Sequence, residues 1–181
     1  MKRIHLGIFS AVLALSSVCA SAQSVQFGFQ GGINLPLGDL DKKVDGRLGF
    51  VIGGHAGLYY GNGHELRPWV DYTHYSGGWQ PGVGGTFGKS TVSAFGAGAD
   101  YVYYTETRPQ GIYLTMGLGL QNWSVNPDQG PSTSKTSLTL AAGAGYRINR
   151  SVSAEGRVLL GQFQASNGQA TALQALVTIR L

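Results

Sequence analysis

Residues 112–123 read IYLTMGLGLQNW, and apolar side chains occupy every second position from Ile112 to Leu120. Tyr, Thr and Gly fill the positions between them. A period of two residues places the apolar side chains on one face of a β-strand and the small or polar ones on the other. The stretch therefore predicts one extended strand, longer than the ~5–6 residues typical of soluble proteins.

The same alternation recurs on both sides of this stretch and predicts eight strands. Their expected bounds are Val25–Asn34, Arg47–Tyr60, Glu65–Tyr75, Lys89–Tyr104, Ile112–Trp123, Thr136–Arg147, Ser151–Phe163 and Thr171–Leu181. Most are long enough to cross a bilayer at a tilt, which takes ~9–11 residues. Because an even number of strands can close on itself without open edges, we expect an all-β fold, an eight-stranded antiparallel up-and-down transmembrane β-barrel.

Composition narrows the class of protein. The 181 residues include 29 Gly, and only 12% of them are charged, against about 25% in ordinary soluble domains. An aromatic content of 10% argues against a disordered chain, and the single Cys excludes a disulfide framework. The glycines follow no three-residue period, which excludes collagen, and Lys and Arg form no run typical of nucleic-acid binding.

Residues 1–22 have the pattern of a secretory leader. Lys2 and Arg3 precede an apolar core, and the sequence Ala-Ser-Ala at 20–22 fits the rule for signal-peptide cleavage. We therefore expect a signal peptide over residues 1–22 and a barrel domain over residues 23–181. The leader contains two of the 13 basic residues and none of the nine acidic ones, so the net charge of the barrel is +2 instead of +4. That small charge gives little evidence for an anionic partner.

The lengths of the connecting segments give the expected barrel two different ends. Long loops are expected at Leu35–Gly46, Ser76–Gly88 and Ser124–Lys135, and they alternate with shorter connections such as Gly61–His64. Membrane barrels have longer outer loops and short periplasmic turns, and any binding function is expected on the loops. Aromatic residues near the strand ends predict two interfacial girdles: Tyr59, Tyr60, Tyr101, Tyr103, Tyr104, Tyr113 and Tyr146 beside the turns, with Tyr75, Trp79 and Trp123 beside the loops.

The polar face of the strands has a balanced set of charges. Four acids and four arginines are expected to point inward: Glu65, Asp71, Asp100, Glu155, Arg67, Arg147, Arg157 and Arg180. A buried charge is costly unless it is paired, so the balance predicts a network of ion pairs that plugs the barrel. The alternative is a narrow, low-conductance pore in which the pairs move apart. A barrel of eight strands is just filled by side chains, which favours the plug.

At this point the residues are similar to a known family. The leader, the eight alternating strands, the GAGADY segment at 96–101 and the alternating C-terminal strand resemble small outer-membrane β-barrels of Gram-negative bacteria. These porin-like proteins include the transmembrane domain of outer-membrane protein A and the Ail-type adhesion barrels. In the family the last strand commonly ends in Phe and is read by the outer-membrane assembly machinery, whereas this chain ends in Leu181.

The resemblance implies a location and a set of partners. It implies an exported protein of the outer membrane that contacts membrane lipids and lipopolysaccharide, meets the assembly machinery through its C-terminal strand and is a monomer. It implies no nucleic-acid partner and no cofactor. The expected role is structural or in surface interaction, without catalysis.

One chemical alternative stays open beside this expectation. His74-Tyr75-Ser76 resembles the His-x-Ser of outer-membrane lipid A deacylases, and a His within reach of a Ser can activate it for ester cleavage. The family places Asn after the Ser, whereas this chain has Gly77. His55, His64 and His74 have no close Cys or carboxylate partners at metal-ligand spacing, so no metal site is predicted.

Overall fold

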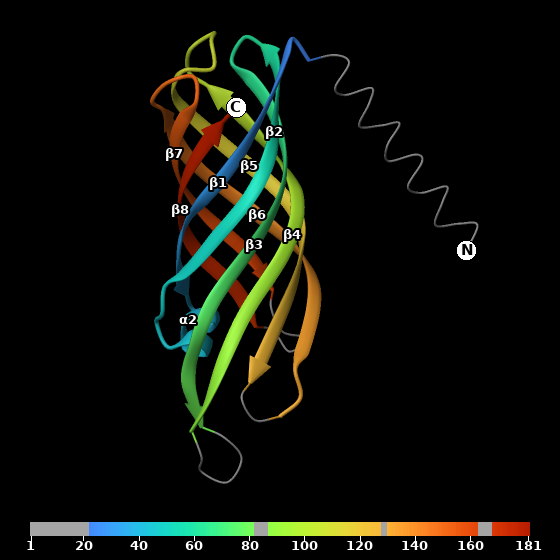
Figure 1. The fold of residues 1–181 in the computed structure, drawn as a ribbon, viewed down its shortest axis with the longest axis vertical. Coiled ribbons are helices and arrows are strands. Elements are labelled where there is room, and N and C mark those ends of the chain that lie inside the picture. The colour runs from blue at the N-terminus through green and yellow to red at the C-terminus, as the bar shows by residue number, and fades with distance from the viewer. Residues whose placement is uncertain (1–21, 82–86, 128–129, 163–167) are drawn as a thin grey trace, which may run out of the picture.

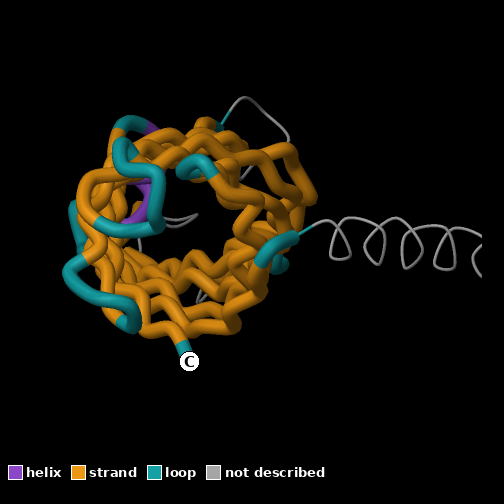
Figure 2. Tube along the Cα trace, turned by 90° about the horizontal axis from the view of Figure 1, so that it is seen from above, coloured by secondary structure: helices purple, strands orange, loops and turns teal. Residues whose placement is uncertain are grey.

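The computed structural model describes residues 22–81, 87–127, 130–162 and 168–181, so the expected signal peptide lies almost entirely outside the described residues. Eight antiparallel strands form a closed barrel in chain order (Figures 1 and 2). Their bounds are β1 Ser24–Leu37, β2 Gly49–Gly61, β3 His64–Pro81, β4 Phe87–Tyr104, β5 Gly111–Pro127, β6 Thr133–Arg147, β7 Val152–Gln162 and β8 Gln169–Arg180. A helix, α2 Asp39–Val44, follows β1.

The first and last strands pair and close the barrel. Their register runs from Gly28 opposite Arg180 to Leu37 opposite Thr171. Every other strand pairs with its neighbours in sequence, so the closed ladder leaves no open sheet edge, as hydrocarbon surroundings require. The predicted eight-stranded up-and-down barrel is confirmed. The start of β1 and the C-terminus lie at the same end, together with the short turns (Figure 1).

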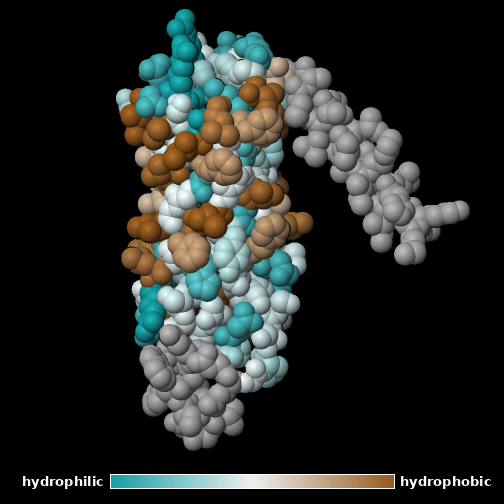
Figure 3. Space-filling model, viewed as in Figure 1, coloured by the Kyte–Doolittle hydropathy of each residue, from teal (hydrophilic) through white to brown (hydrophobic). Residues whose placement is uncertain are grey.

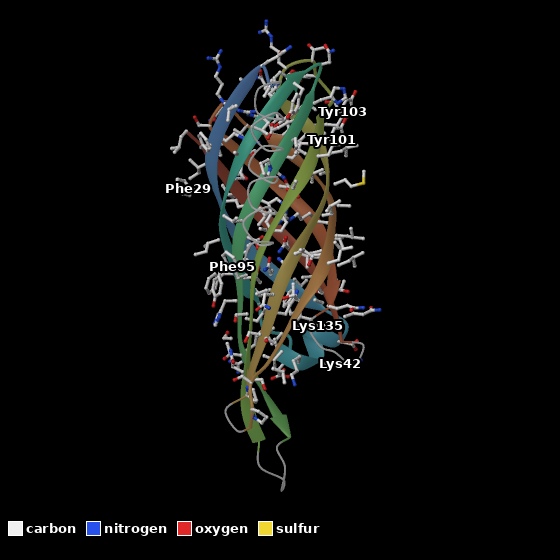
Figure 4. The ribbon with its side chains drawn as sticks, turned by 90° about the vertical axis from the view of Figure 1, so that its right-hand side faces the viewer. Phe29, Lys42, Phe95, Tyr101, Tyr103 and Lys135 are labelled. Atoms are coloured by element: carbon white, nitrogen blue, oxygen red, sulfur yellow. The ribbon has the colours of Figure 1, made fainter. Side chains whose placement is uncertain are left out.

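The apolar face of each strand points out of the barrel. On β5 burial alternates strictly, with Met116 66% exposed and Leu118 60% exposed between buried Thr115, Gly117 and Gly119. Figure 3 shows the apolar side chains as a belt around this side of the barrel, with hydrophilic residues above and below it. Figure 4 places Phe29 and Phe95 on the outside of the wall. An apolar belt of this kind is the lipid-facing surface of a membrane barrel.

The strands are longer than predicted at the long-loop end. Much of the segments expected as the loops Ser76–Gly88 and Ser124–Lys135 is strand, because β3 and β4 pair as far as Pro81 opposite Phe87 and β5 and β6 as far as Val125 opposite Thr133. The loop prediction was wrong there, since Gly, Ser and Pro in these segments suggested turns while ladder pairing with the neighbour kept the backbone extended. The β3–β4 hairpin projects beyond the rest of the barrel in Figure 1.

The expected loop Leu35–Gly46 contains α2, which was not predicted. Asp39 and Asp41 lie in its first turn and Lys42 and Lys43 in its last, the arrangement that a helix dipole favours. Asp45 ends the helix in the left-handed conformation, with φ 56°. Seen along the barrel axis, α2 lies within the ring of strands (Figure 2). Within the described ranges, no helix is both long and apolar enough to cross a membrane.

The aromatic residues follow the predicted girdles only in part. Tyr101, Tyr103 and Tyr146 are exposed on the outer face, and Figure 4 shows the first two near the short-turn end. Four others point into the barrel and are buried, which contradicts a girdle position for them: Tyr75, Tyr104, Tyr113 and Trp123. Adjacent positions of a strand face opposite ways, so lying near a strand end does not decide the face. Trp79 has a side chain outside the described part.

Candidate functional site

The barrel interior is built by the second face of each strand. On β3 the inward positions run from Glu65 through Arg67, Trp69, Asp71 and Thr73, all of them buried. These residues alternate with outward ones such as Val70, which is 51% exposed. The period of two in the sequence thus gathers the polar and charged side chains of the strands into one lumen.

Arg67 holds two carboxylates from different strands. Its Nη2 lies 2.9 Å from Oδ2 of Asp100 on β4 and 2.8 Å from Oε2 of Glu155 on β7, across the lumen. The indole nitrogen of Trp69 donates to the other oxygen of Asp100 at 2.9 Å. All three ionised side chains have at most 1% of their surface exposed. Strands far apart in the wall are therefore joined through one buried guanidinium.

Arg157 extends this cluster. Its Nη1 lies 3.3 Å from Oδ2 of Asp100 and 3.8 Å from Oε1 of Glu155, and its Nη2 lies 3.9 Å from Oδ2 of Asp71. The Nε of Arg157 donates to Gln174 on β8 at 2.6 Å. Two arginines and three carboxylates thus form one group at the middle of the lumen, which we call the central network: Arg67, Asp71, Asp100, Glu155 and Arg157.

A second pair lies nearer the short-turn end. Nη2 of Arg180 lies 3.5 Å from Oε1 of Glu65, and the hydroxyl of Tyr104 donates to Oε2 of Glu65 at 2.8 Å. Tyr113 donates to Glu155 at 3.1 Å and packs against Tyr104, with ring centroids 5.3 Å apart. These two tyrosines connect the pair of Arg180 and Glu65 with the central network.

Arg147 is the predicted inward charge that the structure keeps apart from the others. Arg147 is a buried residue, 2% exposed, and its guanidinium donates to Gln26 Oε1 at 2.8 Å, to the carbonyl of Arg150 at 2.6 Å and to the carbonyl of Asn149 at 3.3 Å. All three acceptors are uncharged. In the part of the chain that the structure describes, Arg147 makes no ion pair. It lies at the short-turn mouth of the barrel, as the last residue of β6.

Inward glycines make room for the network. A Cβ atom on Gly117 would lie 2.0 Å from Oδ1 of Asp100, and one on Gly96 would lie 2.4 Å from Gln121 Cγ. A Cβ on Gly57 would lie 2.8 Å from Oε1 of Glu65. The high Gly content of the sequence therefore has a steric cause at these positions, where a narrow lumen must hold long charged side chains.

The long-loop end of the lumen is apolar, which the sequence analysis missed. Leu40 and Val44 of α2 are fully buried against inward side chains of the strands. This apolar plug consists of Leu40, Val44, Tyr75, Val92, Ala94, Trp123, Val125, Leu159, Ala170 and Ala172. The i, i+4 spacing of Leu40 and Val44 beside Asp and Lys was the available signal for an amphipathic turn of helix.

The structure separates the histidines. His55 points into the lumen and is buried, whereas His64 is the first residue of β3 and His74 lies near the middle of that strand, both on its outer face. Nδ1 of His64 lies 2.6 Å from the hydroxyl of Tyr101. His74 lies 3.4 Å from the hydroxyl of Tyr72 and 5.3 Å from the ring of Phe50, and Ser76 is exposed two residues further along the strand. Among the described residues, no group of three His, Cys, Asp or Glu side chains could hold a metal ion.

Solved structures share this barrel. Ail, the attachment invasion locus protein of Yersinia pestis, solved with the heparin analogue sucrose octasulfate, is 15% identical over 87% of this chain and 97% of its own, with a TM-score of 0.59. Neisserial surface protein A is 19% identical over 88% of this chain and 99% of its own, with a TM-score of 0.56. At these identities the likeness concerns the fold alone.

Sequence comparison agrees with the architecture. A search of curated proteins finds no match. The family described as outer membrane protein beta-barrel domain matches residues 10–180, almost the whole chain. Together with the lipid-facing belt, this match places the protein in the outer membrane as a transmembrane β-barrel, and the chain belongs to the outer membrane protein beta-barrel domain family.

Proposed function

We propose that this barrel has a structural or surface-interaction role without catalysis, and that its interior is plugged. One observation supports the proposal: two layers of buried side chains lie along the lumen. The central network joins opposite walls with buried ion pairs, and the apolar plug with α2 lies at the long-loop end. If these layers close the lumen, the exposed ends of the barrel are the surfaces available for interaction.

The structural role of the central network can be tested with Arg157→Ala. Removing this guanidinium takes a cation from Asp71, Asp100 and Glu155, which are buried. Leaving such carboxylates without their partner costs about 3–5 kcal/mol. We expect the free energy of unfolding of the barrel in lipid vesicles, measured by urea titration, to fall by that amount. An unchanged value would contradict a structural role for the network.

The long-loop end is the proposed interaction surface. Membrane barrels have short periplasmic turns and longer outer loops, so we expect the β3–β4 hairpin to lie on the cell exterior. That hairpin extends past the belt that lies in lipid, on a scaffold held by barrel closure. Heparin is a suitable first probe, since the similar fold of Ail was solved with a heparin analogue.

The experiment compares heparin binding by cells that express the full chain with binding by cells that express a shortened variant. In the variant, residues 77–90 are replaced by an Asn-Gly turn, which suits a two-residue hairpin. We expect the shortened barrel to insert, to keep a shift in gel migration between unboiled and boiled samples, and to lose binding. Equal binding by expressing and non-expressing cells would argue against this surface role.

The alternatives give different readouts. A lipid A hydrolase using His74 and Ser76 would change the mass spectrum of lipid A between cells with and without the protein, and an open pore would give steps of current in planar bilayers. We expect neither change. The contacts of His74 with Tyr72 and Phe50 on the outer face support an aromatic cluster at the membrane interface.

Four further expectations belong to this proposal. They are cleavage of the leader after residue 22, contact with lipopolysaccharide, recognition of the last strand by the assembly machinery and a monomeric state. The alternation of Leu173, Val177 and Ile179 on the lipid side of β8 supports the third of these.

A further inference from the structure

The short-turn end of the barrel contains a polar cavity of about 400 Å³ that plays no part in the proposed surface role. Its wall is formed by the inward faces of the first strands and by two turns that lie at the mouth. The lining residues are Ser24, Gln26, Gly57, Tyr59, Glu65, Arg108, Pro109, Gln110, Arg147 and Arg150. A cavity of this volume is in the range of small-molecule sites.

Three guanidinium groups line this cavity. Arg147 is 98% buried, and Arg108 and Arg150 are exposed on the turns between β4 and β5 and between β6 and β7. Among the described residues, the oxygens to which Arg147 donates are uncharged and come from Gln26 and from the carbonyls of Asn149 and Arg150. A buried charge without an opposite charge is costly, and an oxyanion that enters the cavity would supply one.

The carboxylate in the lining does not compensate these arginines. Glu65 is engaged on the lumen side, where Oε1 lies 3.5 Å from Arg180 Nη2 and Oε2 accepts from the hydroxyl of Tyr104. Glu106, in the same turn as Arg108, is exposed and is not part of the lining. The cavity therefore has an excess of positive charge.

The turn that carries Arg108 is fixed over the mouth. The hydroxyl of Tyr59 on β2 donates to the carbonyl of Thr107, and the amide of Gly63 donates to that same hydroxyl at 3.2 Å. On the opposite side, Asn149 holds the β6–β7 turn by accepting from the amides of Ser151 and Val152, each at 2.8 Å. Both turns are thus tied down, which reduces the entropy lost when a ligand binds.

We propose that this cavity binds a small solute through an oxyanion group, a phosphate or a carboxylate. Guanidinium groups bind both groups through charge-assisted, often bidentate hydrogen bonds. Arg147 supplies the buried contact, and Arg108 and Arg150 close on the anion from the turns. Beyond the cavity lie the pair of Arg180 and Glu65 and then the central network, so the site is a pocket closed on the lumen side that opens at the short-turn end, where β1 begins and β8 ends.

Calorimetric titration of the full-length barrel, purified in a non-ionic detergent, tests the site. The probes are inorganic pyrophosphate and succinate, which carry the two oxyanion groups and little else. We expect saturable binding of at least one of them, weaker at high salt, and the stronger probe identifies the preferred group. No saturable binding of either probe at low salt would overturn the proposal.

Single substitutions locate the binding. Arg147→Gln should weaken binding about tenfold or more, and Arg108→Gln and Arg150→Gln should each weaken it several-fold, as expected for charged hydrogen bonds. The matched control is Lys42→Gln, which removes an exposed cation at the opposite end and should leave binding unchanged. Equal losses in the control, or none in the three arginine variants, would overturn the assignment.

The two other arginines keep the test decisive even if Arg147→Gln fails to fold, since both are exposed residues. Gel migration of unboiled samples confirms folding of each variant before titration. The outcome is independent of the surface role, because heparin binding depends on the hairpin at the other end of the barrel.

Discussion

At the scale of single residues, glycine and charge are coupled in this barrel. Asp100 accepts hydrogen bonds from Arg67, Arg157 and Trp69, so its carboxylate has no freedom to move without breaking one of them. Gly117 on the neighbouring strand faces that carboxylate directly. The absence of a side chain at residue 117 is therefore a condition for the central network.

This coupling predicts that Gly117→Ala destabilises the barrel. The added methyl would lie 2.0 Å from Oδ1 of Asp100, and overpacking of this kind typically costs about 1–3 kcal/mol. The matched control is Gly156→Ala on the outer face of β7, where a Cβ would meet nothing within 4 Å. That control should be neutral or stabilising by up to about 1 kcal/mol. Urea unfolding in lipid vesicles measures both, and equal effects would count against the steric argument.

The sequence sufficed to predict which residues point inward on the polar strands. The alternation around Arg67 and around Glu155 identifies their face because lipid accepts only apolar side chains on the other one. It could not predict how the charges pair: Arg67 reaches Glu155 across the lumen, 88 residues away, while Arg147 is left among neutral oxygens. Which charges pair depends on the tilt and stagger of the strands, and the two-residue alternation of the sequence gives no information on either.

At the scale of elements, α2 turns a loop into part of the interior. It is only six residues long, too short to be stable alone, and it is ordered by the burial of Leu40 and Val44 among strand side chains. Sequence patterning assigned this segment to a loop because its Asp, Lys and Gly residues suggest solvent. The apolar layer that it completes also explains why Tyr75 and Trp123 point inward.

The packing of α2 predicts that Leu40→Ala destabilises the barrel by about 2–5 kcal/mol, since the site is fully buried and surrounded by strands that cannot collapse onto a smaller side chain. Leu48→Ala is the control: it removes the same atoms from a side chain that is 55% exposed shortly after the helix. Its effect should be much smaller. Urea titration of the two variants checks the difference, and equal losses would mean that α2 does not seal the lumen.

At the scale of the whole molecule, the barrel is inverted relative to a soluble protein. Leucines such as Leu114, Leu118 and Leu120 lie outside and ion pairs lie inside, so stability depends on the surrounding lipid. The composition of the chain, poor in charge and rich in Gly, follows from this inversion. The charges that a soluble protein would carry on its surface are limited here to the ends and to a narrow interior.

Because the outer face lies in lipid, a charge placed on it should destabilise the barrel by an amount that depends on its depth in the bilayer. Met116 is 66% exposed within the leucine stripe of β5, and Asn122 lies on the same face beyond the last leucine. Met116→Arg should lower the free energy of unfolding in vesicles by about 2–4 kcal/mol, as for arginine near the bilayer midplane, whereas Asn122→Arg should cost at most about 1 kcal/mol. Both variants keep every inward residue, so the central network cannot account for a difference. Equal losses in the free energy of unfolding would show that residues 116 and 122 do not differ in their depth in the bilayer. The membrane placement of the whole belt would then have to be revised.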